Sequence, residues 1–288
     1  MLKRILIILA KSKKFRKFLH NQMPFLSRMY TAGRNIEDAV DAARGINAAG
    51  MKVIINKLGE IIESKEHSHK ITEEYMQIIK SIHEKNIRAD ISVKPTSLGI
   101  LISEDLFRNN LEKIVGEATK NSIFVWVDME EPEFVNSTIR IFEELYIKHK
   151  NIGLCLQSYL PRTNEDIENI LSRKARIRMV KGVYIIAGEN TIHDKNTVRE
   201  RMLKFSVQLL KNKGDHAIAT HDEEIIKFIK QVAKRYDIDK NSFEFQFLYG
   251  RKKNLQKKLA EEGYRVNVYL PYGGSWINYY LRRLDERF

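Results

Sequence analysis

Two adjacent arginines near the C-terminus, Arg282 and Arg283, are well suited to bind an anion. They lie in the stretch YLPYGGSWINYYLRRLDERF, residues 269–288, where a tyrosine-rich strand pattern and a Gly-Gly turn precede a helical pattern. A guanidinium group is planar, keeps its charge and can pair with a carboxylate through two hydrogen bonds. Neighbours on a helix point about 100° apart, so the pair can approach a small carboxylate from two sides. A basic helix end stabilised by the helix dipole is the alternative interpretation.

Polar side chains also recur at or near the carboxyl ends of short apolar segments. Burying such a group costs free energy unless it is paired, so any single one could be a paired core residue. Together, these cations, acids, amides and tyrosines indicate an anionic substrate and a large polar cofactor. The set consists of Lys94, Asp128, Glu130, Gln157, Tyr159, Arg178, Lys181, Tyr184, Thr220, His221, Asp222, Glu244, Gln246, Tyr249, Tyr269 and Tyr272.

The apolar segments predict the elements that must position these side chains. Short β-branched or aromatic runs alternate with segments whose apolar residues recur every three to four positions, the pattern of amphipathic helices. Such alternation over eight units predicts a closed α/β barrel of the (β/α)8 type, with an open doubly wound sheet as the alternative. No G-x-G-x-x-G follows any predicted strand, so a Rossmann dinucleotide site is not indicated. The predicted strands are 52–58, 89–96, 122–129, 151–159, 175–184, 216–221, 243–249 and 264–272.

In such a barrel the active site lies at the carboxyl ends of the strands, which is where the polar set falls. The sequence therefore predicts a barrel domain over residues 51–288. A helix fits residues 36–50, and with the segment before it forms a helical arm over residues 1–50 that is expected to pack on the barrel.

The positive charge of the chain is concentrated in this arm. The formal net charge is +13, and residues 1–34 contain nine Lys or Arg and no Asp or Glu. The rest of the chain is therefore nearly balanced, which argues against a broad basic surface that binds nucleic acid. The beginning of the arm, MLKRILIILAKSKKFRKFLHNQ, has the pattern of a basic amphipathic helix. It could pack on the barrel or lie on an anionic membrane surface, with nucleic acid as a weaker alternative.

Composition restricts the remaining classes of function. Cys155 is the single cysteine of the 288 residues, which excludes an intramolecular disulfide and indicates a reducing, cytoplasmic location. No apolar run approaches the ~20 residues that span a bilayer. His67 and His69 are expected in a polar loop after the first strand, without a ligand pattern around them, so we expect no metal site.

The motifs, taken in order, resemble those of the FAD-dependent proline dehydrogenase family. The stretches that carry the resemblance are YTAGRNIEDA, ISVKPTSLG, VDMEE, LQSYL, RMVKGVY, IATHD, FEFQFLYG and YLPYGGSWINYYLRRLDER. They extend from about residue 30 to the C-terminus. The resemblance is to the short, single-function bacterial form of the family, and it implies the same barrel fold.

The resemblance implies a role for several substrate-site residues. Arg282, Arg283 and Lys94 would bind the carboxylate of proline, and Glu286 would hold the guanidinium groups in place. Tyr269 would pack against the proline ring and disfavour hydroxyproline. Asp128 would orient the cations, and the remaining walls of the pocket would be Tyr184, Tyr279 and Met179.

The resemblance also implies an FAD site. Arg178 and Gln157 would contact the isoalloxazine ring, where Arg178 would stabilise negative charge on the reduced ring. Further contacts are implied for Val180, Gly182, Thr220, His221 and Gln246, with Gly182 allowing close approach of the backbone. The sequence departs from the family pattern at Met179, Val183 and Ile185, which bears on substrate preference and on the redox potential.

The implied reaction is the oxidation of L-proline to Δ1-pyrroline-5-carboxylate, the first step of proline degradation to glutamate. Hydride would pass to the flavin, and a membrane quinone would then accept the electrons. The basic arm would suit peripheral contact with the inner face of the membrane. Two alternatives stay open: a flavin enzyme for another cyclic or N-alkyl amino acid, such as hydroxyproline, and a barrel without activity that binds nucleic acid.

Overall fold

The computed structural model describes residues 29–59, 62, 64–182 and 191–274 of the chain. Eight parallel strands form a closed barrel in which each strand pairs with its neighbours in sequence and β1 pairs with β8. The predicted (β/α)8 barrel is therefore confirmed. The strands are β1 Lys52–Lys57, β2 Ala89–Val93, β3 Val125–Val127, β4 Ile152–Gln157, β5 Arg176–Val180, β6 His216–Ala219, β7 Phe243–Leu248 and β8 Arg265–Tyr272.

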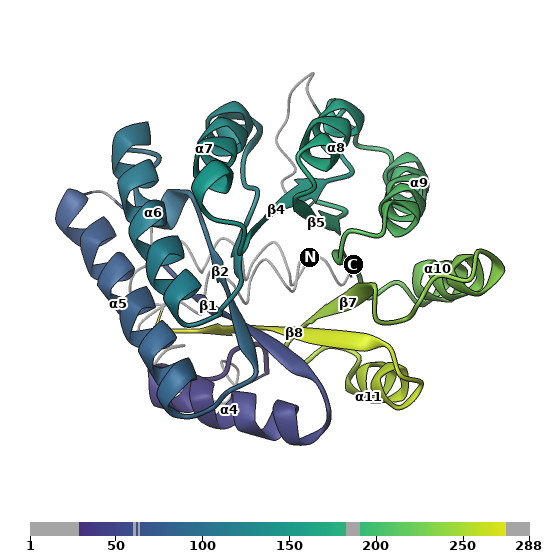
Figure 1. Ribbon diagram of the computed structural model, residues 1–288, viewed down its shortest axis with the longest axis horizontal. Coiled ribbons are helices and arrows are strands. Elements are labelled where there is room, and N and C mark those ends of the chain that lie inside the picture. The colour runs from purple at the N-terminus through teal and green to yellow at the C-terminus, as the bar shows by residue number, and fades with distance from the viewer. Residues whose placement is uncertain (1–28, 60–61, 63, 183–190, 275–288) are drawn as a thin grey trace, which may run out of the picture.

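The described helices lie around the outside of the strands (Figure 1). Several begin at a side-chain cap that satisfies a free backbone N–H, as Ser64, Ser103 and Asp222 do for α5, α6 and α10. The helices are α4 Ile36–Ala48, α5 Lys65–Glu84, α6 Glu104–Lys120, α7 Val135–Lys148, α8 Thr163–Ser172, α9 Lys195–Asn212, α10 Glu223–Arg235 and α11 Lys253–Glu261, with short 3-10 helices η1 Thr96–Leu98 and η2 Pro132–Phe134.

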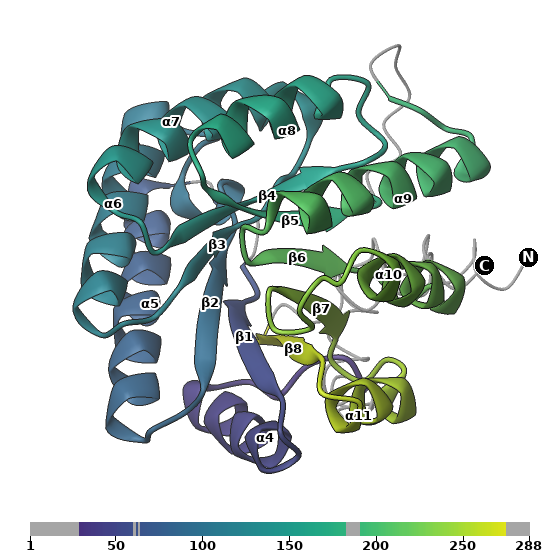
Figure 2. The same cartoon turned by 45° about the vertical axis from the view of Figure 1, so that its right-hand side comes forward.

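Helix α4 precedes the first strand but lies in the ring of outer helices. It packs against both β1 and β8, and Figures 1 and 2 show it beside these two strands. An eighth helix would pack at this position in a (β/α)8 barrel. The predicted helix over 36–50 therefore forms, and it closes the ring between the last strand and the first. Residues 1–28 of the predicted arm lie outside the described residues.

The two faces of the strands carry different chemistry. Side chains alternate along a strand, so neighbours point to opposite faces. The main apolar core lies between strands and helices and contains Ile177 and Met179 of β5. The inner face instead has a small separate apolar cluster of Ile54, Trp126 and Ala217, with Phe124 and Tyr269 packed against it.

Two local features differ from the expectations. The first is the position of His67 and His69, which were expected in a loop but lie in the first turns of α5. That expectation was wrong because Ser64 accepts a hydrogen bond from His67 N and starts the helix there. The second is strand length: the strand predicted to 96 ends at Val93, because Pro95 has no N–H to donate and the chain turns into η1. Within the described ranges, every helix is too short or too polar to cross a lipid bilayer.

The contacts of His216 in β6 determine the protonation state of its ring in the folded protein. Its side chain is buried, Nδ1 accepts a hydrogen bond from Ile177 N at 3.1 Å, and Nε2 lies 3.3 Å from Asn212 Oδ1. This arrangement requires a neutral ring, and burial, assisted by the charge of Arg176, lowers the pKa of His216 to about 4.

We therefore expect the protein to lose stability as pH falls from about 6.5 towards 4. In this window the unfolded chain binds a proton at His216 and the folded chain does not, which favours unfolding. The shift should cost about 2 kcal/mol of unfolding free energy between pH 7.5 and pH 5. Urea denaturation of wild type and His216→Asn at both pH values checks this. A variant with the same pH dependence as wild type would contradict it.

Candidate active site

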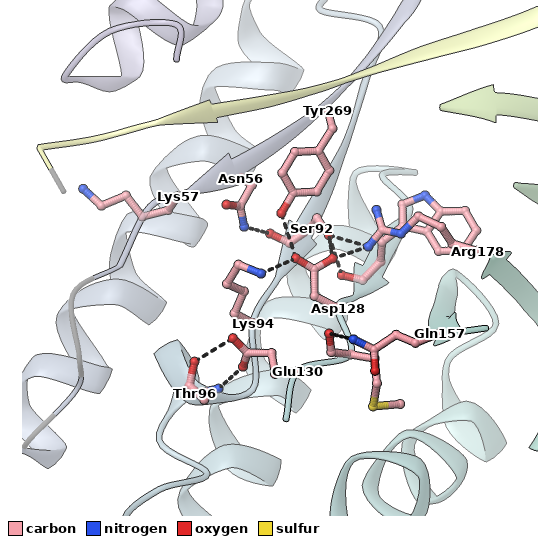
Figure 3. A network of polar contacts seen from close by, with 12 residues as sticks. Asn56, Lys57, Ser92, Lys94, Thr96, Asp128, Glu130, Gln157, Arg178 and Tyr269 are labelled. Carbon is pink, nitrogen blue, oxygen red and sulfur yellow. Dashed lines mark hydrogen bonds and ion pairs between the residues drawn. The ribbon is translucent and has the colours of Figure 1, made fainter. Parts of the chain in front are cut away.

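A buried network of charged and polar side chains lies at the carboxyl ends of the strands, with Asp128 at its centre (Figure 3). Asp128 directly follows β3, and its Oδ2 accepts hydrogen bonds from Lys94 Nζ at 2.9 Å and Tyr269 OH at 2.7 Å. Its Oδ1 accepts from Ser92 Oγ at 2.8 Å and from Arg178 Nη2. Side chains from or next to β2, β3, β5 and β8 thus meet on one carboxylate.

The charges in this network stabilise one another. Burial alone would raise the pKa of Asp128, but the positive charges of Lys94 and Arg178 outweigh burial and lower that pKa to about 2. Burial would likewise lower the pKa of Arg178, and the charge of Asp128 raises it instead. Burial and the same carboxylate raise the pKa of Tyr269 well above 10. At neutral pH the network therefore contains an ionised carboxylate, two cations and a neutral phenol.

Arg178 is held from several sides inside the barrel. Its guanidinium carbon lies 5.2 Å from the ring centroid of Trp126 and 5.6 Å from that of Tyr269, within the range of cation–π contacts. Nη2 donates to Ser92 Oγ at 3.0 Å, and Nη1 is 3.4 Å from Gln246 Oε1. A side chain with this many contacts keeps one orientation, which suits a group that must face a bound molecule.

Lys94 is positioned by the turn that follows β2. Glu130 is buried and accepts hydrogen bonds from Thr96 N at 2.8 Å and from Thr96 Oγ1 at 2.9 Å. Burial raises the pKa of Glu130, an effect that the charge of Lys94 opposes. Two hydrogen bonds to one carboxylate thus fix the chain two residues after Lys94, and its side chain, 23% exposed, reaches Asp128.

Gln157, at the end of β4, presents an acceptor atom without a partner. Its Nε2 donates to Met129 O at 3.2 Å, while its Oε1 is buried and has no hydrogen-bond partner. A buried unpaired amide oxygen costs free energy, so a donor from a bound molecule would stabilise it. Val180 ends the neighbouring β5 and pairs in register with Gln157.

Three of the residues expected at the cofactor already have structural contacts. Gly182 has a φ of +95°, and a Cβ there would lie 2.1 Å from the Tyr159 ring, which explains the glycine without a ligand. His221 Nε2 accepts from Leu248 N at 2.9 Å, and Thr220 Oγ1 accepts from Asp222 N at 3.1 Å. The first contact lies between the ends of β4 and β5, and the bond of His221 joins the ends of β6 and β7.

The structure does not bring Met179 to the mouth of the barrel. Met179 is completely buried in the main core and points to the face opposite Arg178, because neighbours on a strand alternate. A direct contact with a substrate is therefore not supported by its position. Five other residues expected at the substrate lie outside the described residues: Tyr184, Tyr279, Arg282, Arg283 and Glu286.

Some residues of the network were not singled out from the sequence. Ser92 and Trp126 bind or contact Arg178, and each lies two positions before an expected site residue, Lys94 and Asp128. The two-residue period of a strand could have placed them on the same face. Among the described residues, no group of His, Cys, Asp and Glu could hold a metal ion.

The fold and the network together define a (β/α)8 barrel with a buried network of charged residues at the carboxyl ends of the strands, where enzymes of this fold have their active sites. Comparison with known proteins identifies the family. The family model described as proline dehydrogenase matches residues 39–287, and the chain belongs to the proline dehydrogenase family.

Individual relatives agree with this assignment. The chain is 38% identical over 255 residues to Proline dehydrogenase 2 of Bacillus subtilis, covering 88% of this chain and 84% of the relative. It is 33% identical over 289 residues to Proline dehydrogenase of Deinococcus radiodurans, covering 99% and 93%. Among solved structures, proline utilization A (PutA) from Bdellovibrio bacteriovorus shares the fold, with a TM-score of 0.86 at 22% identity, over 91% of this chain and 32% of that one.

Replacing Asp128 with Ala should strongly destabilise the protein, because Arg178 would remain buried without a counter-ion. Removing one partner of a buried ion pair costs about 3–5 kcal/mol of unfolding free energy. Asp105→Ala is the control, because the Asp105–Arg108 pair has an Asp side chain that is 77% exposed. We expect the control to lose less than about 1 kcal/mol. Urea denaturation measures both, and equal losses would contradict the role given to Asp128.

Proposed function

We propose that the protein oxidises L-proline to Δ1-pyrroline-5-carboxylate with FAD as cofactor and a quinone as final electron acceptor. The observation that supports this best is the network in which Asp128 binds Lys94, Arg178 and Tyr269 at the mouth of the barrel. It places positive charge and an aromatic ring beside each other, as an amino acid with an apolar ring requires. The relatives named proline dehydrogenase favour proline as that amino acid.

The carboxylate of proline would bind the cations. Lys94 Nζ is held by Asp128 Oδ2 at 2.9 Å, so its ammonium group keeps its position. Arg282 and Arg283 would supply two further cations, with Glu286 holding them in position. Bidentate pairing of a guanidinium with a carboxylate would fix the direction of the substrate.

The ring of proline would pack against tyrosines. Tyr269 is held by its hydroxyl hydrogen bond to Asp128, so its ring has a fixed position on β8. Tyr184 and Tyr279 would complete the walls of the pocket. An extra ring hydroxyl, as in hydroxyproline, would meet the ring of Tyr269, which supports proline as the preferred substrate.

The residues present fit an FAD group. The isoalloxazine ring has an N–H group that could donate a hydrogen bond to Gln157 Oε1, which is buried and has no partner. Arg178 of β5 and Gln246 of β7 both point into the barrel, with Arg178 Nη1 3.4 Å from Gln246 Oε1, and they would supply donors to the ring. Val180, Gly182, Thr220 and His221 would line the remainder of the site. When bound, the flavin would accept the hydride from the ring carbon next to the proline nitrogen.

The role of Asp128 follows from its ionisation. With a pKa lowered to about 2 by Lys94 and Arg178, it holds no proton near neutral pH and already accepts four hydrogen bonds. It would therefore orient the cations and Tyr269 instead of taking a proton from the substrate. Proline would bind with its amine deprotonated, and orientation would supply the main part of the acceleration by the protein.

A purified protein with this function should be yellow, and L-proline should bleach it under anaerobic conditions. Arg282→Met and Arg283→Met should each raise the proline concentration for half-maximal bleaching at least about tenfold, through loss of a charged hydrogen bond. Arg235→Met, an exposed position of α10, serves as the control and should behave as wild type.

Two results would contradict this proposal. A colourless protein would argue against a bound flavin and would favour a barrel without this activity. A yellow protein that is bleached by hydroxyproline or an N-alkyl amino acid but not by proline would show a different substrate.

Electron transfer to a membrane quinone requires contact with the bilayer, and the basic N-terminal arm would supply it. Deletion of residues 1–20 should reduce binding to vesicles with anionic lipid, because each basic residue near such a surface contributes about 1 kcal/mol. Vesicle sedimentation measures the binding, and neutral vesicles serve as the control. Equal binding with and without the arm would exclude it as the membrane contact.

A further inference from the structure

Glu244 of β7 is a buried carboxylate whose two oxygen atoms contact different parts of the barrel interior. Oε2 lies 3.1 Å from Arg265 Nη2 and 3.4 Å from Arg176 Nη2, and both arginines begin their strands at the amino end of the barrel. Oε1 accepts a hydrogen bond from Gln246 Nε2 at 2.6 Å, two residues nearer the carboxyl end of β7. This carboxylate therefore connects the amino end of the barrel to a residue expected at the cofactor.

The amide of Gln246 lies between this carboxylate and Arg178. Its Oε1 is 3.4 Å from Arg178 Nη1, and its Nε2 donates to Glu244. A carboxylate can only accept hydrogen bonds, and a guanidinium can only donate them. The reversed amide would place its NH2 group against the guanidinium and its oxygen against the carboxylate. Glu244 and Arg178 together therefore hold the amide in one orientation, with its oxygen toward Arg178.

A small residue of β6 allows Arg178 to reach Gln246. The register of the strands aligns Arg178 with Ala217, and Ala217 with Glu244. Ala217 is completely buried in the inner cluster, and its single methyl group leaves room for the guanidinium to extend from β5 past β6. The contact between β5 and β7 is thus part of the packing of the barrel interior.

A role only in neutralising the two arginines is the alternative explanation for Glu244. Both arginines have other acceptors, because Arg265 Nη1 donates to Asp215 Oδ1 at 2.5 Å and Arg176 Nε donates to Asp215 O at 2.8 Å. Their side chains are also partly exposed, 33% for Arg265 and 19% for Arg176. Neutralisation involves Oε2 alone, so it does not account for the short hydrogen bond that Oε1 accepts.

We infer that Glu244 is a positioning residue of the cofactor site, which sets the reduction potential of the flavin by holding the amide oxygen of Gln246 toward Arg178. This inference rests on the proposed function, in which Arg178 and Gln246 contact the isoalloxazine ring. Arg178 would stabilise negative charge on the reduced ring, and an amide oxygen beside it offsets part of that effect. Charges and dipoles next to a flavin are the means by which a protein tunes its potential.

Glu244→Gln tests this inference because it should reverse the amide. The oxygen of the new side chain would stay on Arg176 and Arg265, so its NH2 group would face Gln246 Nε2, and two donors cannot pair. Gln246 would then turn its oxygen away from Arg178. We expect the ratio of reduced to oxidised flavin at a fixed potential to rise about tenfold, or about 30 mV for a two-electron couple. Anaerobic equilibration of the holoprotein with a redox dye measures this ratio.

A double-mutant cycle separates the orientation of the amide from the loss of a negative charge. Gln246→Leu removes the amide, so it should itself raise the ratio about tenfold. In that background Glu244→Gln should change the ratio by less than about twofold, because residues that act through one another are not additive. Additive effects would show that Glu244 acts by its charge alone and would overturn the inference.

Glu244→Asp keeps the charge and provides a second test. Its carboxylate is about 1.5 Å shorter, so it can pair with the arginines and no longer reach Gln246. We expect the ratio to rise about threefold, because the amide is then held by Arg178 alone. A ratio equal to that of wild type would contradict a role for the hydrogen bond to Gln246.

Asp215→Asn is the matched control at the far end of the same contacts. It removes the charge that pairs with Arg265, but its side chain is 53% exposed and does not contact Gln246. Its φ is +55°, a conformation that asparagine adopts readily. We expect the control to keep the ratio of wild type within about twofold.

The results distinguish this inference from the proposed function. A yellow wild type whose ratio is unchanged in both Glu244 variants would overturn the inference and leave the proposed function intact. Loss of flavin from folded Glu244→Asp would also overturn it, because Glu244 would then be required for binding and not for the potential. A yellow wild type that fails to oxidise L-proline contradicts the proposed substrate alone. A colourless wild type contradicts the proposed function, and the inference fails with it.

Discussion

The neutralisation of buried charge around Asp128 is the constraint on which the rest of this site depends. Arg178 lies in the interior of the barrel, where an unpaired guanidinium would be very costly. The carboxylate that follows β3 compensates this charge, and at the same time binds Lys94 and Tyr269. Because these groups come from or next to four different strands, the barrel must close in its observed register before all of them are satisfied. The assembly of the charged site and the closure of the barrel therefore both depend on the side chain of Asp128.

The two faces of each strand have different roles: the outer face forms the apolar core, and the inner face carries the polar groups of the site. Along β5, Ile177 and Met179 pack against the helices, and Arg178 between them points into the barrel. The apolar core outside the sheet supplies hydrophobic stabilisation, which allows the inner face to carry polar groups. The small cluster of Ile54, Trp126 and Ala217 lies on the inner face and gives Arg178 an aromatic surface. Substitutions on the two faces should accordingly have different consequences for stability and for binding.

The sequence predicted the barrel well because its short apolar runs and amphipathic segments reflect local burial. It also grouped Lys94, Asp128, Arg178 and Tyr269, since the carboxyl ends of parallel strands must meet. It did not predict the direction of Met179, for which a family position was a weaker guide than the two-residue alternation with Arg178. The helical position of His67 was missed because a single serine cap decides it. The reason for Gly182 was missed because the ring of Tyr159 is distant in sequence. Contacts of this kind depend on tertiary structure, which local patterns do not contain.

Helix α4 has a consequence for the relation between sheet and helices. It fills the position between β8 and β1 that a barrel usually assigns to the helix after its last strand. The ring of helices therefore begins one element earlier along the chain than the ring of strands, because α4 precedes β1. Among the described residues, the ring of helices is complete without any element after β8, and α4 connects the packing of the first strand to that of the last.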